Sequence, residues 1–84
     1  MVTILYFARL RETLGKASEQ LALPANVSDL VSLREFLRKR GGAWAEEMAA
    51  GKPVRAAINQ DIANEDTRIK EGDEIAFFPP VTGG

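Results

Sequence analysis

The sequence holds few side chains that could catalyse a reaction. It has 84 residues and contains neither Cys nor His. Thiolate nucleophiles, the commonest acid–base group and the commonest ligands of transition metals are therefore missing. The most distinctive chemical group is the carboxylate that follows Gly83-Gly84. Because glycine has no Cβ, such an end could enter a narrow tunnel in another protein with its terminal carbonyl unshielded.

Acyl chemistry at Gly84 would require activation. A free carboxylate is a poor electrophile, because its charge repels nucleophiles and oxide is a poor leaving group. We expect ATP to activate the carboxylate as an acyl-adenylate. Since the chain lacks Cys and His, a partner has to supply nucleotide binding and catalysis.

Two prolines stiffen the approach to this end. Pro79 and Pro80 hold the backbone extended and cannot donate hydrogen bonds to a sheet. We therefore expect a folded domain over residues 1–78 and an extended tail over residues 79–84. Phe77 and Phe78 precede the prolines and would anchor the tail at its root.

The remaining candidate motifs are weaker. The last third is rich in acidic residues, but their spacing fits no calcium-binding loop, and we expect no metal site. These residues are Asp61, Glu65, Asp66, Glu71, Asp73 and Glu74. Asn26-Val27-Ser28 matches the glycosylation pattern, but it stands where a helix is expected to begin in a chain without a secretory signal.

The composition is that of one small globular domain, with 45% hydrophobic and 27% charged residues. A core of this size leaves little room for a cofactor, so we expect none to be bound and any chemistry to occur at the surface. The net charge of −1, with both signs interspersed, argues against nucleic-acid binding. Without a signal peptide or a membrane-spanning run, the expected compartment is the cytoplasm.

The first quarter of the chain predicts two strands. Residues 2–8 are rich in β-favouring side chains, and the period of two of a strand places apolar residues on both of its faces. Residues 10–14 could form one helical turn that ends at Gly15. A second strand is expected over residues 17–23, before Pro24.

The rest of the chain predicts helices and then strands. Asn26 is the expected N-cap of the main helix, whose apolar residues recur at helical spacing as far as Gly41-Gly42. A short helix over 43–50 follows, and the expected strands cover 54–58, a short piece around Ile62, and 74–78. This order predicts an α+β fold, in which an N-terminal hairpin joins a mixed sheet and the main helix packs on one face.

The strands carry more apolar side chains than one face needs. If Ile75 and Phe77 face the helix, alternation turns Phe78 outward, and the same argument turns Phe7 outward and adds Ile62. Large side chains left in water forgo roughly 1.5–3 kcal/mol each. We therefore expect these residues to form a docking surface, unless loops cover them.

These motifs together resemble a known family. The tail and the strand before it are similar to the C-terminal signature of the small, sulfur-carrier subunits of molybdopterin synthase, the MoaD family. The matching residues are Glu71-Gly72-Asp73-Glu74-Ile75-Ala76 followed by Phe77-Phe78-Pro79-Pro80-Val81-Thr82-Gly83-Gly84, with Leu5-Tyr6-Phe7-Ala8, Arg11-Glu12 and Ala57-Ile58-Asn59-Gln60. The resemblance covers essentially the whole chain.

The resemblance implies a ubiquitin-like β-grasp fold and a reaction cycle. An E1-like enzyme would adenylate Gly84 with ATP, and a sulfur-donor protein would convert it to a thiocarboxylate. The large synthase subunit would then receive the tail and pass sulfur to cyclic pyranopterin monophosphate, and two such deliveries would build the dithiolene of molybdopterin. The chain would be the sulfur-donating subunit of the complex and not a catalyst by itself.

The resemblance also implies roles for individual residues. Gly84 would bear the sulfur. The residues that thread the partner would be Pro79, Pro80, Val81, Thr82 and Gly83. The hydrophobic interface would consist of Phe7, Ile62 and Phe78, with Arg11 as a polar contact.

Two other functions are compatible with a Gly-Gly end. A ubiquitin-like modifier would join Gly84 to a target lysine through an isopeptide bond. A thiamine-pathway sulfur carrier would use the same terminus, although such proteins usually lack the Phe-Pro-Pro approach. The fate of the activated acyl group separates the carrier from the modifier.

Overall fold

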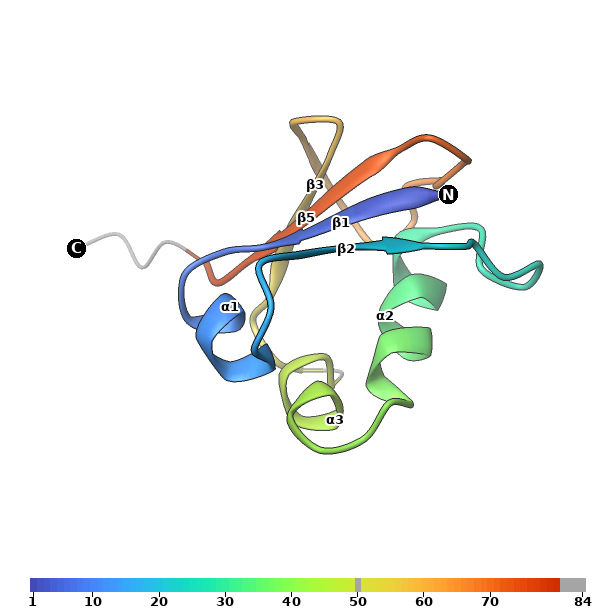
Figure 1. Cartoon of the computed structure of the whole chain (residues 1–84). Coiled ribbons are helices and arrows are strands. Elements are labelled where there is room, and N and C mark those ends of the chain that lie inside the picture. Colours follow the sequence, from blue (N-terminus) through green and yellow to red (C-terminus); the bar gives the residue numbers. More distant parts are fainter. Residues whose placement is uncertain (50, 81–84) are drawn as a thin grey trace.

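The computed structural model describes residues 1–49 and 51–80. The described part folds into a sheet with helices packed below it (Figure 1). In chain order the elements are β1 (Val2–Tyr6), α1 (Arg9–Leu14), β2 (Ser18–Leu21), α2 (Leu30–Arg38), α3 (Ala43–Glu47), β3 (Arg55–Ile58), β4 (Asp61–Ala63) and β5 (Glu74–Phe78). The predicted α+β fold with a mixed sheet is confirmed.

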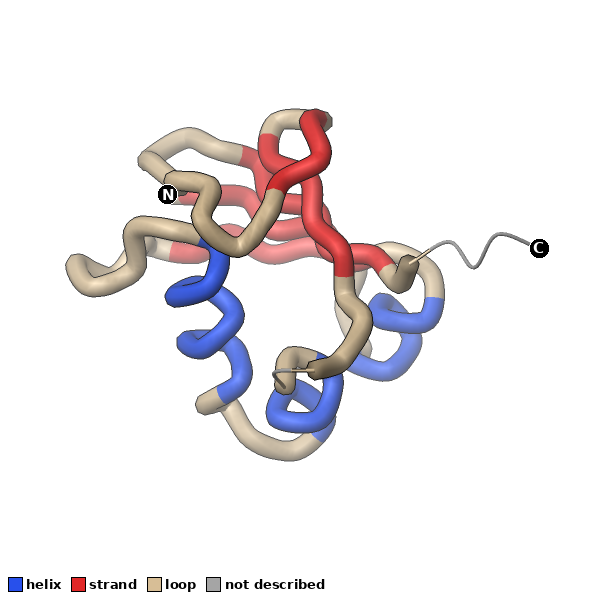
Figure 2. The backbone as a smooth tube through the Cα atoms, turned by 180° about the vertical axis from the view of Figure 1, so that it is seen from behind, coloured by secondary structure: helices blue, strands red, loops and turns tan. Residues whose placement is uncertain are grey.

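The first and last strands lie side by side near the centre of the sheet. The strand order is β2-β1-β5-β3-β4. β1 and β5 run parallel, whereas β2 pairs antiparallel with β1, and β3 pairs antiparallel with both β5 and β4. The helices lie on one face of this sheet (Figure 2), so the sheet has an inner face toward the helices and an outer face turned away from them.

The core fills the space between the inner face and the helices. It is a single cluster of buried side chains from the strands, from all three helices or their ends, and from two loops. Its members are Val2, Ile4, Tyr6, Leu10, Val27, Leu30, Leu33, Leu37, Met48, Ala56, Ile58, Ile69, Ile75 and Phe77. The strict alternation of burial in β1 and β5 shows that each strand gives every second residue to this core.

The main helix begins later than the sequence predicted. Its N-cap is Asp29 and not Asn26. The Asp29 carboxylate accepts a hydrogen bond from the Ser32 amide at 2.9 Å, and the Ser32 hydroxyl accepts one from the Asp29 amide at 3.2 Å. This reciprocal capping satisfies two amide groups that a helix start at Asn26 would leave open. Val27 is still buried, but it reaches the core from the preceding loop.

Other boundaries also differ from the prediction. β1 ends at Tyr6 because the backbone of Ala8 takes a positive φ of 53° and turns into α1. α3 ends at Glu47, and Ala50 lies outside the described residues. Between β3 and β4, Asn59 and Gln60 both have positive φ and form the two-residue loop of a hairpin.

A cluster of polar and aromatic side chains connects the core beside β5 to the chain just after α2. The Tyr6 hydroxyl donates a hydrogen bond to Glu19 at 2.7 Å, and Arg40 donates two to the same carboxylate at 2.9 Å each. The Arg40 guanidinium lies 4.5 Å from the centroid of the Trp44 ring. Tyr6 in turn stacks against Phe77 with a centroid distance of 6.2 Å.

These contacts shift two pKa values in opposite directions. Burial and the hydrogen bond to Glu19 raise the pKa of Tyr6 far above its usual range, so the phenol stays protonated and acts as a donor. Burial by itself would raise the pKa of Glu19, but the hydrogen bonds from Arg40 and Tyr6 and the charge of Arg40 outweigh it. The pKa of Glu19 is therefore lowered.

Glu19→Gln is expected to lower the free energy of unfolding by about 1–2 kcal/mol at pH 7, because it removes the charge from hydrogen bonds that are largely shielded from water. The folded pKa of Glu19 lies below the unfolded value of about 4.3. The stabilisation is thus complete above that value and is lost as the pH falls through the folded pKa. Urea unfolding at pH 7 and near pH 3 should show a difference between the two proteins that shrinks in acid.

Glu35→Gln is the matched control, since Glu35 also pairs with an arginine, Arg38, but its side chain is 49% exposed. It should cost less stability at pH 7 than Glu19→Gln. Equal losses in the two variants would show that the Glu19 group contributes no more than a surface pair.

Candidate functional site

The two phenylalanines at the end of β5 face opposite ways. Phe77 is fully buried in the core, whereas Phe78 is half-buried on the outer face. The Phe77 carbonyl accepts a hydrogen bond from the Phe7 amide at 3.1 Å, which fixes the end of β5 to the segment that follows β1. The root of the tail is therefore held by packing on one face and by the backbone of a neighbouring segment.

An apolar row crosses the outer face of the sheet. The strand register places Leu5 of β1 beside Ala76 of β5, Ala76 beside Ala57 of β3, and Ala57 beside Ile62 of β4. One step closer to the tail, Phe78 lies opposite Arg55. The row is flat at its centre, since two of its members are alanines.

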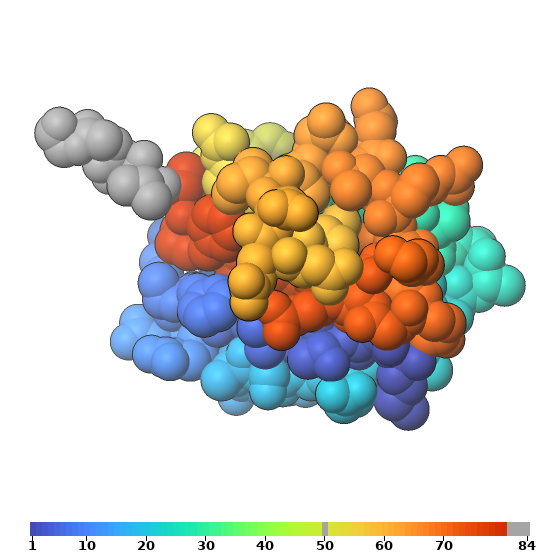
Figure 3. Space-filling view, turned by 90° about the horizontal axis from the view of Figure 1, so that it is seen from above, coloured from blue at the N-terminus to red at the C-terminus, as the bar shows by residue number. Residues whose placement is uncertain are grey.

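Two large side chains on this face are open to water. Ile62 is 70% exposed and Phe7 is 46% exposed. In Figure 3, which looks onto the outer face, the blue N-terminal segment, the red last strand and the gold segment around β4 form one continuous surface. We call the surface formed by Leu5, Phe7, Ala57, Ile62, Ala76 and Phe78 the outer patch. Within the described residues, no loop buries Phe7 or Ile62.

The sequence prediction found only part of the outer patch. It named Phe7, Ile62 and Phe78 because they are large. Alternation within the last strand also placed Ala76 on the face of Phe78. Ala57 was missed, because only the strand register brings it into the row, where its neighbours leave it 9% exposed. Leu5 shares the exposed face of β1 with Thr3, as the alternation indicated.

Three arginines lie on α1 and β3, two elements that flank β5. Arg11 is exposed on α1, as a polar contact would require. Arg9 is bound to the buried Glu47 of α3, with 3.1 Å between Nη2 and Oε1, so its charge is partly balanced. Arg55, exposed on β3, adds a cation next to Phe78 and was not named from the sequence.

The connection between β1 and α1 contains a strained residue. Ala8 has φ 53° and ψ −130°, a conformation that suits the second residue of a type II′ turn. The turn is closed by a hydrogen bond from the Leu10 amide to the Phe7 carbonyl at 3.1 Å. Glycine is usual at this position, and a non-glycine residue costs on the order of 1–3 kcal/mol there.

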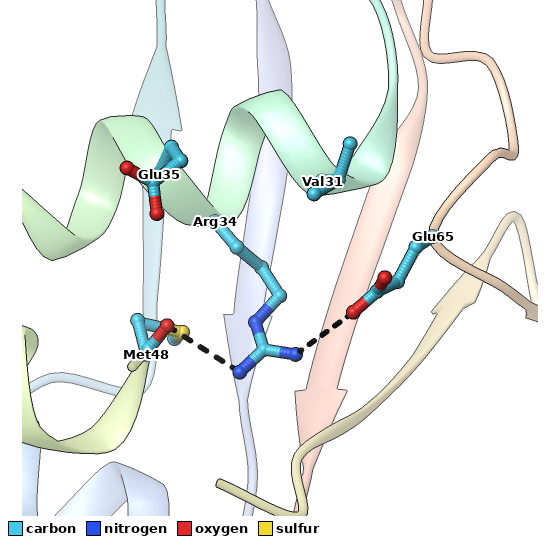
Figure 4. Close-up of a pocket in the computed structure, with 5 residues that line it drawn as sticks. All are labelled: Val31, Arg34, Glu35, Met48 and Glu65. Carbon is cyan, nitrogen blue, oxygen red and sulfur yellow. Dashed lines mark hydrogen bonds and ion pairs between the residues drawn. The ribbon is translucent and has the colours of Figure 1, made fainter. Parts of the chain in front are cut away.

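The helical side of the molecule offers little room for a ligand. A hollow of about 40 Å³ lies between α2, α3 and the loop before residue 66 (Figure 4), and it would hold only a few water molecules. The side chain of Arg34 crosses the hollow, and its Nη2 donates hydrogen bonds to the carbonyls of Met48 and Ala49. The Nη1 atom of Arg34 lies 3.9 Å from Oε1 of Glu65. These contacts fasten α3 to α2, which is a structural role.

Residues 1–49 and 51–80 contain no group of three or more His, Cys, Asp or Glu side chains arranged to hold a metal ion. No helix in that part of the chain has the length and apolar character needed to cross a membrane.

Val81, Thr82, Gly83 and Gly84 lie outside the described residues. Pro79 and Pro80 are described, and both are half-buried and outside any helix or strand. The predicted boundary between a domain of residues 1–78 and a tail of residues 79–84 therefore stays a prediction.

Comparison with known proteins gives full-length matches. Residues 4–84 match the ThiS family. The molybdopterin synthase sulfur carrier subunit of Haemophilus influenzae is 40% identical over 84 residues, which is all of both chains. The protein of the same name from Escherichia coli is 38% identical over the same full length.

Solved structures of similar proteins have the same fold. A molybdopterin converting factor subunit 1 from Pyrococcus furiosus aligns with a TM-score of 0.76 and 28% identity, over 95% of this chain and 97% of that one. Subunit 1 in a complex of subunits 1 and 2 of the molybdopterin-converting factor from Helicobacter pylori aligns with a TM-score of 0.64 and 27% identity, over 99% and 97%. The small archaeal modifier protein 1 of Haloferax volcanii, at 20% identity and a TM-score of 0.75 over 95% and 97%, shares the fold.

The β-grasp fold expected from the resemblance is thus confirmed. The similarity to the archaeal modifier, at 20% identity, concerns the fold alone. The two full-length relatives at about 40% identity are both molybdopterin synthase sulfur carrier subunits. The chain belongs to the ThiS family and, within it, to the sulfur carrier subunits of molybdopterin synthase.

Proposed function

We propose that the chain carries sulfur as a thiocarboxylate on Gly84 and delivers it inside the large subunit of molybdopterin synthase. One observation supports this proposal above the others. β5 lies between β1 and β3, and it leads without an intervening loop from the core into Pro79 and the tail, beside an exposed apolar surface. A rigid body with a docking surface at the root of its tail suits delivery of a terminus into another protein.

The chemistry follows from the carboxylate. One of its oxygens attacks the α-phosphate of ATP, pyrophosphate leaves, and an acyl-adenylate forms. Sulfide-level sulfur (HS⁻), supplied by a donor protein, then attacks the acyl carbon, AMP leaves with the electron pair of the broken C–O bond, and the S–H proton is lost to solvent. The resulting thiocarboxylate sulfur is the nucleophile toward cyclic pyranopterin monophosphate.

The partner proteins supply what this chain lacks. An E1-like enzyme would bind ATP and adenylate Gly84, and the chain itself would hold no cofactor. The Helicobacter pylori subunit 1 forms a complex with subunit 2, and we infer that this chain binds a large subunit in the same way. The proposed location of this cycle is the cytoplasm.

The outer patch is the proposed docking surface. Phe7, Ile62 and Phe78 would contact the large subunit, and Arg11 would add a polar contact. Burying an exposed Ile62 and a half-exposed Phe7 would recover apolar contact that the free chain forgoes. Pro79, Pro80, Val81, Thr82 and Gly83 would thread the partner so that Gly84 reaches its active site.

Deletion of Gly84, or addition of one residue after it, should abolish sulfur transfer without changing thermal unfolding, because the reacting atom is displaced while the core stays intact. The assay incubates the chain with the activating enzyme, ATP and a sulfur source, and then weighs it intact. Unaltered protein should gain the mass expected for replacing one oxygen by sulfur. Sulfur transfer by the deletion variant, or conjugation to other proteins without any thiocarboxylate, would contradict the proposal.

Ile62→Ala should weaken binding to the large subunit about tenfold, because it removes an apolar side chain from the outer patch. Its free energy of unfolding should change by less than about 0.5 kcal/mol, since the side chain is exposed. Titration calorimetry and urea unfolding would measure the two quantities separately. Val31→Ala is the matched control, because Val31 is 41% exposed on α2, on the helical side, and it should leave the affinity unchanged.

Phe78→Ala should weaken the same binding, although half-burial of Phe78 predicts some loss of stability as well. Unchanged affinity in both Ile62→Ala and Phe78→Ala would show that the large subunit docks elsewhere.

A further inference from the structure

Two connections in the described chain use the same backbone geometry with different residues. Ala8, before α1, has φ 53° and ψ −130°, and Gly42, before α3, has φ 56° and ψ −133°. Both turns are closed by the same type of hydrogen bond, from the Leu10 amide in the first case and the Trp44 amide in the second, at 3.1 Å each. The fold therefore accepts glycine at this conformation, yet the first turn carries alanine.

The methyl group of Ala8 gives the free chain no visible benefit. Ala8 is exposed and does not belong to the buried cluster. Strained residues persist where the strain is offset elsewhere, and they concentrate at functional sites. Since the core gains nothing from this methyl group, a contact with a partner is one compensation that the exposure of Ala8 leaves open.

The position of Ala8 indicates where that compensation arises. It directly follows Phe7, whose side chain is 46% exposed and whose amide is bound to the Phe77 carbonyl at the root of the tail. It directly precedes α1, which presents the exposed Arg11. Ala8 is thus continuous with the outer patch and lies at the border nearest to the tail.

We propose that the methyl group of Ala8 is a contact point for the large subunit and helps to select that partner, so that docking uses a group which the free chain carries at a cost in stability. This inference rests on the proposed docking function. It adds to the outer patch a residue that neither size nor hydrophobic alternation would single out.

The test is Ala8→Gly in the full chain, with measurements of both stability and affinity. Removing the strain should raise the melting temperature by about 4–8 °C. Losing the methyl contact should weaken binding to the large subunit about three- to tenfold. Stability and affinity would thus move in opposite directions, which a purely structural role of Ala8 does not predict.

Two further variants serve as controls. Gly42→Ala introduces the same strain at α3, where a Cβ would meet nothing within 4 Å, so it should lower the melting temperature and leave the affinity unchanged. Ala8→Ser keeps a Cβ at the docking surface and should bind within about twofold of the unaltered chain.

The outcomes separate this inference from the proposed function. Unchanged affinity in Ala8→Gly, with normal binding by the unaltered chain, would overturn the inference alone. Equal losses in Ala8→Ser and Ala8→Gly would also overturn it, because a retained Cβ would then not preserve the contact. Failure of the unaltered chain to bind the large subunit would overturn both proposals.

Discussion

The parallel pairing of β1 with β5 is the constraint on which the rest of the structure depends. It brings the first and last strands of the chain together near the middle of the sheet. Parallel neighbours require a long crossover connection, and here that connection carries the helices that cover the inner face. With its last strand fixed between two neighbours, the chain can end in a tail without loosening the sheet.

This arrangement separates two tasks along one strand. Ile75 and Phe77 of β5 contribute to the core, while Ala76 and Phe78 contribute to the outer patch. A strand buried on one face can do both, because successive side chains point to opposite sides. One strand thus supplies side chains both to the core and to the proposed docking surface.

Much of this organisation could be predicted from the sequence, and the failures have physical causes. The period of two in the terminal strands gave the correct inward and outward residues, since each strand has one buried face. The start of α2 was misplaced because Asn26 and Asp29 are both good N-caps, and only the reciprocal contact with Ser32 decides between them. Ala57 could not be assigned to the outer patch, because its place there depends on its neighbours in β4 and β5, which leave it only 9% exposed. The backbone strain at Ala8 has no signature in the sequence.

The direction of β1 has a practical consequence. Because β1 and β5 are parallel, Met1 lies at the end of the sheet opposite to the point where β5 leaves it (Figure 1). The amino group of Met1 forms an ion pair there with Glu71. The Met1 carbonyl accepts a hydrogen bond from the Gly72 amide at 3.0 Å. A surface or a reporter attached at the amino end would therefore stand at the opposite end of the sheet from the point where the chain leaves β5. Tethering the chain there would not block that point.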